Sequence, residues 1–440
     1  MKVLLLSMDS VGEMLPFAIR CVKAGHTVRI WMAPENHKET GKGFKGVERV
    51  ENWLSSVKWA DLVVPSGNHQ FVPKLDALRK QGVKVFGPSK KSAELEVERA
   101  VGMKFFTDHG IDVPEWEEFA NLKEAEEHVR SKPDRYVFKT LGSEDDKSLS
   151  YVSKSAADMV ARLQRWQKLG MASKGPVMLQ EVIDGIELGV SRWMGADGFI
   201  GPPNINWEFK KLLSGDCGPN CGEAGTVLKY TEESKLAEEV LDPLEDALVE
   251  MQHLGDIDVN CIVDKQGKAW PLEFTTRLGW PAFNIMQAAH KGDPVQWMLD
   301  ACEGEDTLQT SPAVACGVVI AQPDYPNSKL TKAEVSDIPI YGVTEANKKY
   351  LAPQSVKIEK MPDMDGDAVV ERDLWTTTGD YIAVVTGMGK TVRQACDRAY
   401  STVKELHIPN MMYRDDIGEK LESELPELQK HGYAKDVSYS

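Results

Sequence analysis

The first 90 residues alternate short apolar runs with amphipathic segments, and this pattern constrains the fold more than any other feature. It predicts strands at "KVLLL" (2–6), "HTVRIWM" (26–32), "DLVVPSG" (61–67) and "VKVFGPS" (83–89). It predicts helices at "EMLPFAIRCVKAG" (13–25) and "VPKLDALRKQG" (72–82). Continuous apolar strands separated by helices are typical of a parallel sheet covered on both faces. Such sheets bind ligands at the carboxyl ends of their strands.

The rest of the chain predicts mixed α and β structure. We expect one helix over 92–110, a small α+β unit that includes "YVFKTL" (136–141) and "PVMLQEVID" (176–184), and a long helix over 234–255. A β-rich module begins at about 313, and the acidic tail after Ile417 predicts a surface helix followed by a loose end. The predicted class is therefore α/β, with a β-rich C-terminal part.

Length and charge narrow the function. A chain of 440 residues is long enough for about three domains. Its net charge of −16 argues against nucleic-acid and anionic-membrane partners. The seven cysteines form no CxxC pair or disulfide framework, which fits a reducing cytosol. No segment approaches the roughly 20 apolar residues of a membrane span. We expect a cytoplasmic monomer or homodimer.

A predicted β-hairpin at "DVNCIVDKQGKAWPLEFTTRLG" (258–279) places polar side chains on one face. Because side chains alternate along a strand, Glu273 and Arg277 lie opposite to Leu272 and Phe274. A turn closed by Asp264 and Gly267 would pair Glu273 with Asp258, and a slip of two residues would pair it with Asn260. Either register gathers carboxylate and amide oxygens, which suit Mg²⁺. By itself, the hairpin favours the simpler interpretation of a solvated polar face.

The order and spacing of several blocks along the chain are distinctive. They are "VFGPSKKSAELE" (85–96), "YVFKTLG" (136–142), "LQEVIDGIE" (179–187), "DCGPNCGEAG" (216–225), "IVDKQGKAWPLEFTTRLG" (262–279), "GVVIAQPDYP" (317–326), "VTGMGKTVRQACDRAY" (385–400) and "YRDDIG" (413–418). In these blocks, over nearly its whole length, the chain resembles the phosphoribosylamine–glycine ligase (GAR synthetase) family of ATP-grasp enzymes. The resemblance implies small-molecule carboxylate and amine substrates. ATP phosphorylates the carboxylate, and the amine displaces phosphate to give an amide.

The resemblance also implies residues for ATP. Lys139 matches the phosphate-binding lysine of the family, and Arg99 stands where the family has an earlier lysine. A solvated helix arginine is an equally good interpretation of Arg99 from the residues alone. Gln180, Glu181 and Val182 match the hinge whose backbone reads adenine. Glu187 fits the acceptor for the ribose hydroxyls.

Further matches concern the metal and the reacting groups. Glu273 matches the main ligand of Mg²⁺ (or Mn²⁺), and Asn260 or Asp258 would supply a ligand from the partner strand. Arg277 would face phosphate or a substrate carboxylate. Asn220 and Asp216 are the polar anchors of "DCGPNCGEAG" (216–225), a loop that closes over the phosphates in the family. Lys210 and Lys211 precede this loop, where the family also carries basic residues.

Three departures from the family pattern fall at substrate-binding positions. The first turn, "SMDSVGEM" (7–14), retains only Gly12 and carries Asp9 and Glu13 where the family has a glycine-rich turn with Arg-Glu-His. The flap "GSEDDKSL" (142–149) places Lys147 among three acids instead of glycines. Thr275 and "GWPA" (279–282) replace an asparagine and an acidic turn. These changes favour an acceptor other than phosphoribosylamine.

We therefore predict an N-terminal pre-ATP-grasp domain (1–98), an ATP-grasp domain (99–312, with a lid at about 114–182) and a β-rich C-terminal domain (313–440). The predicted function is an ATP-dependent carboxylate–amine ligase that joins an amino acid such as glycine to an amine. Two alternatives stay open: an authentic phosphoribosylamine–glycine ligase of purine synthesis, and a non-catalytic nucleotide-binding paralogue.

Overall fold

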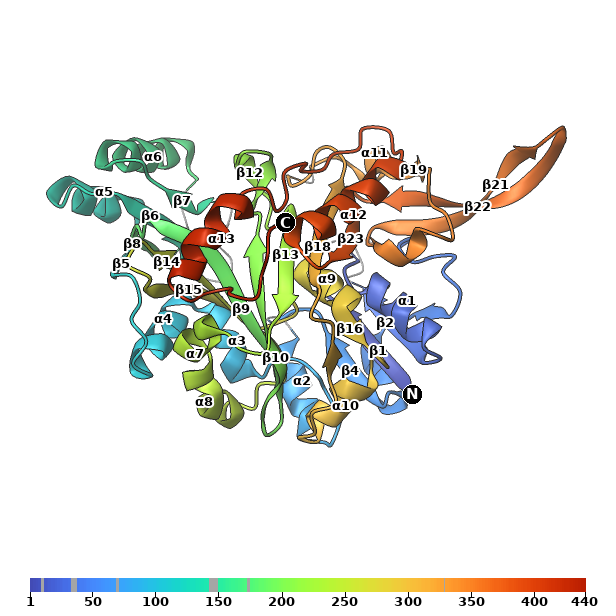
Figure 1. Cartoon of the computed structure of the whole chain (residues 1–440), viewed down its shortest axis with the longest axis horizontal. Coiled ribbons are helices and arrows are strands. Elements are labelled where there is room, and N and C mark those ends of the chain that lie inside the picture. Colours follow the sequence, from blue (N-terminus) through green and yellow to red (C-terminus); the bar gives the residue numbers. More distant parts are fainter. Residues whose placement is uncertain (9–11, 33–37, 69–70, 142–148, 172–174, 328) are drawn as a thin grey trace.

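The computed structural model describes all residues except 9–11, 33–37, 69–70, 142–148, 172–174 and 328. The chain folds around a large central sheet, with the N-terminal sheet and the lid packed at its two sides (Figure 1). Among the described residues, no helix is both long and apolar enough to cross a membrane. All seven cysteines carry free thiols.

The N-terminal part is a parallel sheet in the order β3-β2-β1-β4, as the alternating pattern predicts. Its elements are β1 (Lys2–Ser7), α1 (Leu15–Lys23), β2 (Thr27–Met32), β3 (Val47–Arg49), η1 (Trp53–Trp59), β4 (Leu62–Pro65) and α2 (Val72–Arg79). The strand predicted over 83–89 is reduced to a single parallel bridge between Val63 and Val85.

The helix predicted over 92–110 is two helices, α3 (Lys90–Val97) and α4 (Arg99–Asp108). The helix is interrupted at Glu98, whose φ of −104° and ψ of 86° are not helical. Gly102 of α4 packs on Leu95 of α3 and on Phe274, and Phe106 stacks on Phe274 with 4.1 Å between ring centroids. Packing against the neighbouring strand therefore overrides helix propensity here.

The lid is a four-stranded sheet in the order β5-β8-β6-β7, covered by two helices. Its elements are β5 (Trp116–Phe119), α5 (Leu122–Ser131), β6 (Tyr136–Thr140), β7 (Tyr151–Val152), α6 (Ala156–Leu169) and β8 (Val177–Glu181). It has a hydrophobic core of its own, built around Phe138, Leu163 and Trp166.

The central sheet has eight antiparallel strands in the order β15-β14-β9-β10-β13-β18-β23-β20. They are β9 (Gly185–Gly195), β10 (Gly198–Glu208), β13 (Gly225–Tyr230), β14 (Gly255–Asp264), β15 (Ala269–Thr275), β18 (Val314–Ala321), β20 (Leu351–Pro353) and β23 (Tyr381–Gly389). One sheet thus joins strands from both sides of residue 313, because β13 pairs with β18.

Helices and short elements complete the fold. They are β11 (Lys211–Leu213), β12 (Cys217–Asn220), α7 (Lys235–Val240), η3 (Asp242–Leu244), α8 (Glu245–Glu250), α9 (Ala282–Ala289), β16 (His290–Lys291), α10 (Gln296–Cys302), β17 (Gln309–Thr310), α11 (Lys332–Val335), β19 (Ser336–Ile340), η4 (Lys348–Tyr350), β21 (Val356–Asp365), β22 (Ala368–Thr378), α12 (Val392–Glu405) and α13 (Leu421–Lys430). The hairpin of β21 and β22 projects from the body (Figure 1).

Two further predictions about helices fail in part. The single helix expected over 234–255 is divided into α7, η3 and α8, and Pro243 stands at the break. Proline has no N–H to continue a helical ladder. The tail forms α13 as predicted, but its end is not loose, since Tyr433 and Val437 are buried in the central core.

Candidate active site

The hairpin of β14 and β15 sets the register of the candidate metal face. Asn260 pairs with Glu273, and Asp258 pairs with Thr275. The first register considered from the sequence, with Glu273 opposite Asp258, is wrong, and the slipped register is found. An irregularity between Asn260 and Cys261 shifts the pairing, so that β15 accommodates one extra residue.

Glu273 lies at the centre of a charged cluster that draws on separate parts of the chain. Arg99 Nη1 lies 2.7 Å from Glu273 Oε2, and Lys210 Nζ lies 3.8 Å from Oε1. Lys210 Nζ also lies 2.6 Å from Glu187 and 3.2 Å from Glu208. Burial alone would lower the pKa of Lys210, but the surrounding carboxylates hold this pKa well above its ordinary value.

Lys139 of β6 brings the lid to this cluster. Its side chain is buried, and Arg99, Glu273, Lys210 and Glu187 are the charges that act on it. Burial, followed by the charge of Arg99, lowers the pKa of Lys139 to about 7. Three basic groups thus gather where an anionic ligand would relieve their mutual repulsion.

Glu208 and Glu223 are functional candidates that sequence reasoning did not select, and Lys210 was considered only as a basic residue before the closing loop. Asn260 Nδ2 donates to Glu208 Oε2 at 3.1 Å, and Asn206 Nδ2 donates to Asp258 Oδ2 at 2.7 Å. Burial, and then the charge of Glu208, raises the pKa of both Asp258 and Glu223 well above the usual range. The available signal in the sequence was spacing, because Glu208 ends a buried strand and Lys210 lies two residues later.

The oxygen atoms on this face fit a hard divalent cation. The side-chain oxygen of Asn260 is buried and has no hydrogen-bond partner among the described residues. Glu273 and Glu208 stand beside Asn260. The carboxyl of Asp258 is buried, and the charge of Lys210 only partly offsets the charges of Glu208 and Asp256. Within the described chain, no three Asp, Glu, His or Cys side chains form a complete metal-binding group. Mg²⁺ ordinarily binds through one or two carboxylates together with substrate phosphates.

The candidate adenine hinge leads from the lid sheet into the central sheet. Gln180 is buried in β8, where it pairs with Val137 and Trp116. The Glu181 backbone N–H donates to the carbonyl of Glu115 at 2.8 Å, and Val182 follows the strand. The hinge therefore joins the strand beside Lys139 to β9, which carries Glu187.

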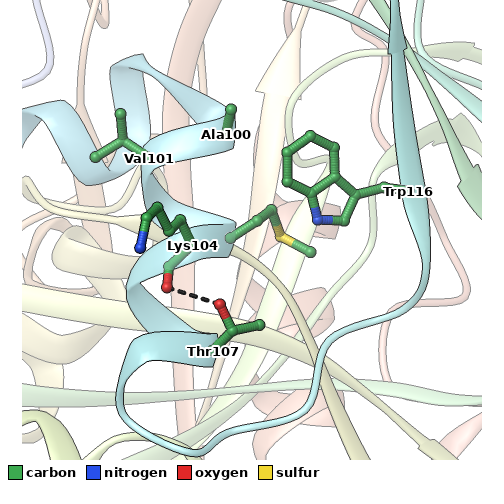
Figure 2. A pocket seen from close by; sticks show the side chains of 6 residues that line it. Ala100, Val101, Lys104, Thr107 and Trp116 are labelled. Carbon is green, nitrogen blue, oxygen red and sulfur yellow. Dashed lines mark hydrogen bonds between the residues drawn. The ribbon is translucent and has the colours of Figure 1, made fainter.

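A cavity of about 350 Å³ lies at the same junction, between α4 and β5. Figure 2 shows Trp116 facing the helix and Thr107, whose hydroxyl donates to the Lys104 carbonyl at 2.9 Å. Its walls are Ala100, Val101, Met103, Lys104, Thr107 and Trp116. None of the residues selected for ATP lines this cavity, so it is separate from the charged cluster.

Three residues selected from the sequence lie elsewhere. Arg277 Nη2 lies 3.4 Å from Glu96 of α3, and Arg277 Nη1 donates to the Leu278 carbonyl at 2.9 Å. Lys211 and Asn220 pair with each other in the β11–β12 hairpin.

The β11–β12 hairpin is attached to the C-terminal part of the chain. Arg414 lies 2.8 Å from Asp216 and donates to the Lys211 carbonyl at 3.1 Å. The Gly215 N–H donates to Asp416 at 2.8 Å. Asp216, expected to anchor a closing loop, therefore anchors the hairpin to the 414–416 segment.

Parts of the first turn and the flap fall outside the described residues. They are Asp9, Ser10 and the flap positions 142–148, including Lys147. Gly12 is described and has a φ of +68°, and an added Cβ would lie 2.9 Å from the Gln354 carbonyl oxygen. The first turn therefore packs closely on the C-terminal part, which only glycine permits.

Comparison with known proteins identifies the family of the chain. Residues 98–282 match the ATP-grasp (A) domain of phosphoribosylglycinamide synthetase, and residues 315–420 match its C domain. Phosphoribosylamine–glycine ligase from Salmonella typhimurium is 26% identical over 356 residues, which cover 78% of this chain and 79% of that protein. The Haemophilus influenzae enzyme is 26% identical over 357 residues, with the same coverage.

Solved structures share the fold. Phosphoribosylamine–glycine ligase from Thermotoga maritima superposes with a TM-score of 0.71 at 21% identity, covering 94% of this chain and 100% of that one. An L-amino acid ligase from Bacillus licheniformis gives a TM-score of 0.59 at 14% identity, covering 92% and 98%. The two matched domains together span about two thirds of the 440 residues, and the chain belongs to the phosphoribosylglycinamide synthetase family of ATP-grasp proteins.

Proposed function

We propose that the protein is an ATP-dependent carboxylate–amine ligase that forms an amide through an acyl phosphate. The observation that carries this proposal is the gathering of Arg99, Lys139 and Lys210 around Glu273, from α4, the lid and the end of β10. A polyanion such as ATP suits three basic groups held close together. Family membership supplies the reaction class.

The reaction has two steps. A carboxylate oxygen of the first substrate attacks the γ-phosphorus of ATP, which gives an acyl phosphate and ADP. The amine nitrogen then attacks the acyl carbon, the carbon–nitrogen bond forms, the bond to phosphate breaks, and the amine loses a proton to solvent. Lys139 and Arg99 would hold the phosphates, and Lys210 would neutralise charge that develops during transfer.

The remaining roles follow the same geometry. The backbone of Gln180–Val182 would read adenine, and Glu187 would accept from the ribose hydroxyls. Glu273, Asn260 and Glu208 would hold Mg²⁺ or Mn²⁺, with Asp258 behind them. When bound, this cation neutralises phosphate charge and orients the transferred group. Arg277, Lys211 and Asn220 would act only if substrate or a closed lid extends the site to them.

The first substrate would be an amino acid such as glycine, and the acceptor an amine other than phosphoribosylamine. The acidic residues of the first turn support the second point, because they stand where a sugar phosphate would need N–H groups or basic side chains. A cytosolic monomer or homodimer is the state we propose, and the seven free thiols support that compartment.

Release of ADP from ATP by the purified protein, against a panel of amino acids combined with amines, tests the proposal. We expect hydrolysis to need both a carboxylate and an amine, and an amide to form in equal amount. Tight ATP binding without turnover on any pair would instead support the non-catalytic paralogue. Efficient turnover on glycine and phosphoribosylamine would support the purine enzyme.

A further inference from the structure

A second cavity, of about 200 Å³, lies where the N-terminal, ATP-grasp and C-terminal parts meet. The residues that line it are Glu13, Cys221, Gly222, Glu223, Trp280, Tyr325, Gln354 and Tyr381. Glu223 links this cavity to the charged cluster, because Glu208, Lys210 and Asp258 act on its carboxyl. The cavity therefore adjoins the place where an acyl phosphate would form.

The ionisable side chains of the cavity are acidic, and since burial raises the pKa of Glu223 well above its usual range, a bound cation would stabilise its ionised form. The described lining of the cavity contains two carboxylates, Glu13 and Glu223, and no lysine, arginine or histidine. Glu13 is fully buried and accepts from the Ser66 hydroxyl at 2.5 Å. Thr226 donates its hydroxyl to Glu223. Such a lining disfavours a phosphate group, which needs basic side chains or a cluster of N–H groups.

Aromatic rings form the rest of the wall. The rings of Tyr325 and Tyr381 lie 5.5 Å apart in an edge-to-face arrangement, and the Tyr325 hydroxyl donates to the Cys221 carbonyl at 2.6 Å. Trp280 contributes a third ring. Aromatic faces beside carboxylates attract a desolvated cation through the ring quadrupole and through charge.

Two buried polar groups at the cavity lack partners. Gln354 is 1% exposed, and neither end of its side-chain amide has a hydrogen-bond partner among the described residues. The same holds for the indole N–H of Trp280. Buried polar groups are almost always paired in folded proteins, so these two point to a ligand that both donates and accepts.

We propose that this cavity binds the acceptor substrate, and that this acceptor is an amine with a second, positively charged nitrogen, of the short-diamine class. The charged end lies between Glu13 and Glu223 against the aromatic wall, and the uncharged amine reaches the acyl carbon. The Gln354 amide pairs with a polar group of the bound substrates. This inference rests on the proposed ligase function and specifies its acceptor.

The test compares three amines in the ATP turnover assay, each with the same amino-acid panel. They are 1,4-diaminobutane, butylamine, which lacks the second charge, and O-phosphoethanolamine, which is anionic. We expect 1,4-diaminobutane to have a KM at least about tenfold lower than butylamine. O-phosphoethanolamine should be the poorest acceptor.

Two variants test whether Glu223 and Glu13 cause the preference for the diamine. Glu223→Gln and Glu13→Gln keep the side-chain size and the capacity to accept a hydrogen bond but remove the charge. Each should abolish most of the preference for the diamine over butylamine, while the KM for ATP stays within about twofold. Glu371→Gln, on the exposed part of β22, removes the same charge elsewhere and should preserve the preference.

Calorimetric titration of 1,4-diaminobutane into the wild-type protein tests the cavity assignment separately from the ligase function. Diamine binding that Glu223→Gln weakens, without turnover on any pair, would retain the cavity assignment and reject the ligase. Turnover that favours butylamine or the phosphorylated amine would retain the ligase and overturn the cationic acceptor. Absence of both binding and turnover would overturn both.

Discussion

Arg99 and Glu273 are 174 residues apart in the chain, and their side chains form an ion pair of 2.7 Å. Arg99 begins α4, after the break at Glu98, and Glu273 lies opposite Asn260 in the central sheet. The pair brings together one residue selected for phosphate and one selected for the metal. It also places a positive charge beside the half-buried carboxyl of Glu273, whose oxygens a cation could share.

Substitution of Glu273 by glutamine should weaken the response to Mg²⁺. The amide keeps the size of the side chain but loses the charge that would hold the cation. Since even groups outside the first coordination shell contribute about 10–100-fold to metal affinity, we expect at least a tenfold rise in the Mg²⁺ concentration for half-maximal ATP hydrolysis. A Mg²⁺ titration at saturating ATP measures this change.

The control for this experiment is Glu371→Gln, at an exposed position of β22. It should leave the Mg²⁺ response unchanged. Equal Mg²⁺ responses in the wild type and in Glu273→Gln would remove Glu273 from the metal site and leave its role as the partner of Arg99.

Substitution of Lys139 by alanine should weaken ATP binding. A charge-assisted hydrogen bond to phosphate contributes about 1.5–3 kcal/mol, which corresponds to about 10–150-fold in Kd. Isothermal calorimetry with ATP and Mg²⁺ measures the change. The matched control is Lys123→Ala, on the exposed face of α5, which should bind ATP like the wild type. An unchanged Kd for Lys139→Ala would favour the paralogue that binds without turnover.

The sequence predicts those parts of the fold that local patterns determine. It does not predict those parts that depend on contacts between residues distant in sequence. The parallel N-terminal sheet and the β14–β15 hairpin follow from apolar runs and turn residues, and both are found. The register of the hairpin could not be fixed, because the irregularity after Asn260 leaves no mark in the hydrophobic pattern. The break at Glu98 depends on Phe274, which is distant in sequence.

The same limit applies to the charged residues. Arg99 could be read as solvated or functional until the fold brought Glu273 to it. Lys210 and Lys211 are adjacent in the sequence, and only the folded structure shows that Lys210 is the one that contacts Glu187 and Glu208. Glu223 gains its significance from Tyr325 and Tyr381, which enter from the C-terminal part of the chain.

The stability of the fold should fall in mild acid because of His253. Its Nδ1 lies 2.9 Å from the Ser92 hydroxyl and its Nε2 lies 3.0 Å from the Asp256 carbonyl oxygen, so Nε2 carries the proton. Burial, only partly offset by the bond to the Asp256 carbonyl, lowers the pKa of His253 to about 4. The unfolded chain, with an ordinary pKa of about 6.5, binds the proton first as the pH falls.

The contribution of His253 is therefore complete above pH 6.5 and is lost between about pH 6.5 and 4, and it amounts to roughly 3 kcal/mol. Thermal melting of the wild type and of His253→Gln across this range measures it. The variant should have a lower Tm at pH 7.5 and a shallower fall in Tm on acidification. Parallel curves for the two proteins would show that His253 is not the titrating group.

Phosphoribosylamine should be a poor acceptor for this protein. A sugar phosphate carries about two negative charges at neutral pH. The buried Glu13 and the nearby Glu223 lie at the second cavity, and its described lining contains no basic side chain to offset them. The assay follows amide formation from glycine, ATP and freshly made phosphoribosylamine, with the Salmonella typhimurium phosphoribosylamine–glycine ligase as the positive control. We expect a rate far below that of the control at equal enzyme concentration.

Turnover on the order of 1–10³ s⁻¹ would contradict this expectation and identify the purine reaction as the activity. In that case Lys210 or another basic side chain must approach the phosphate in the closed enzyme, and Lys210→Ala should then raise the KM for phosphoribosylamine.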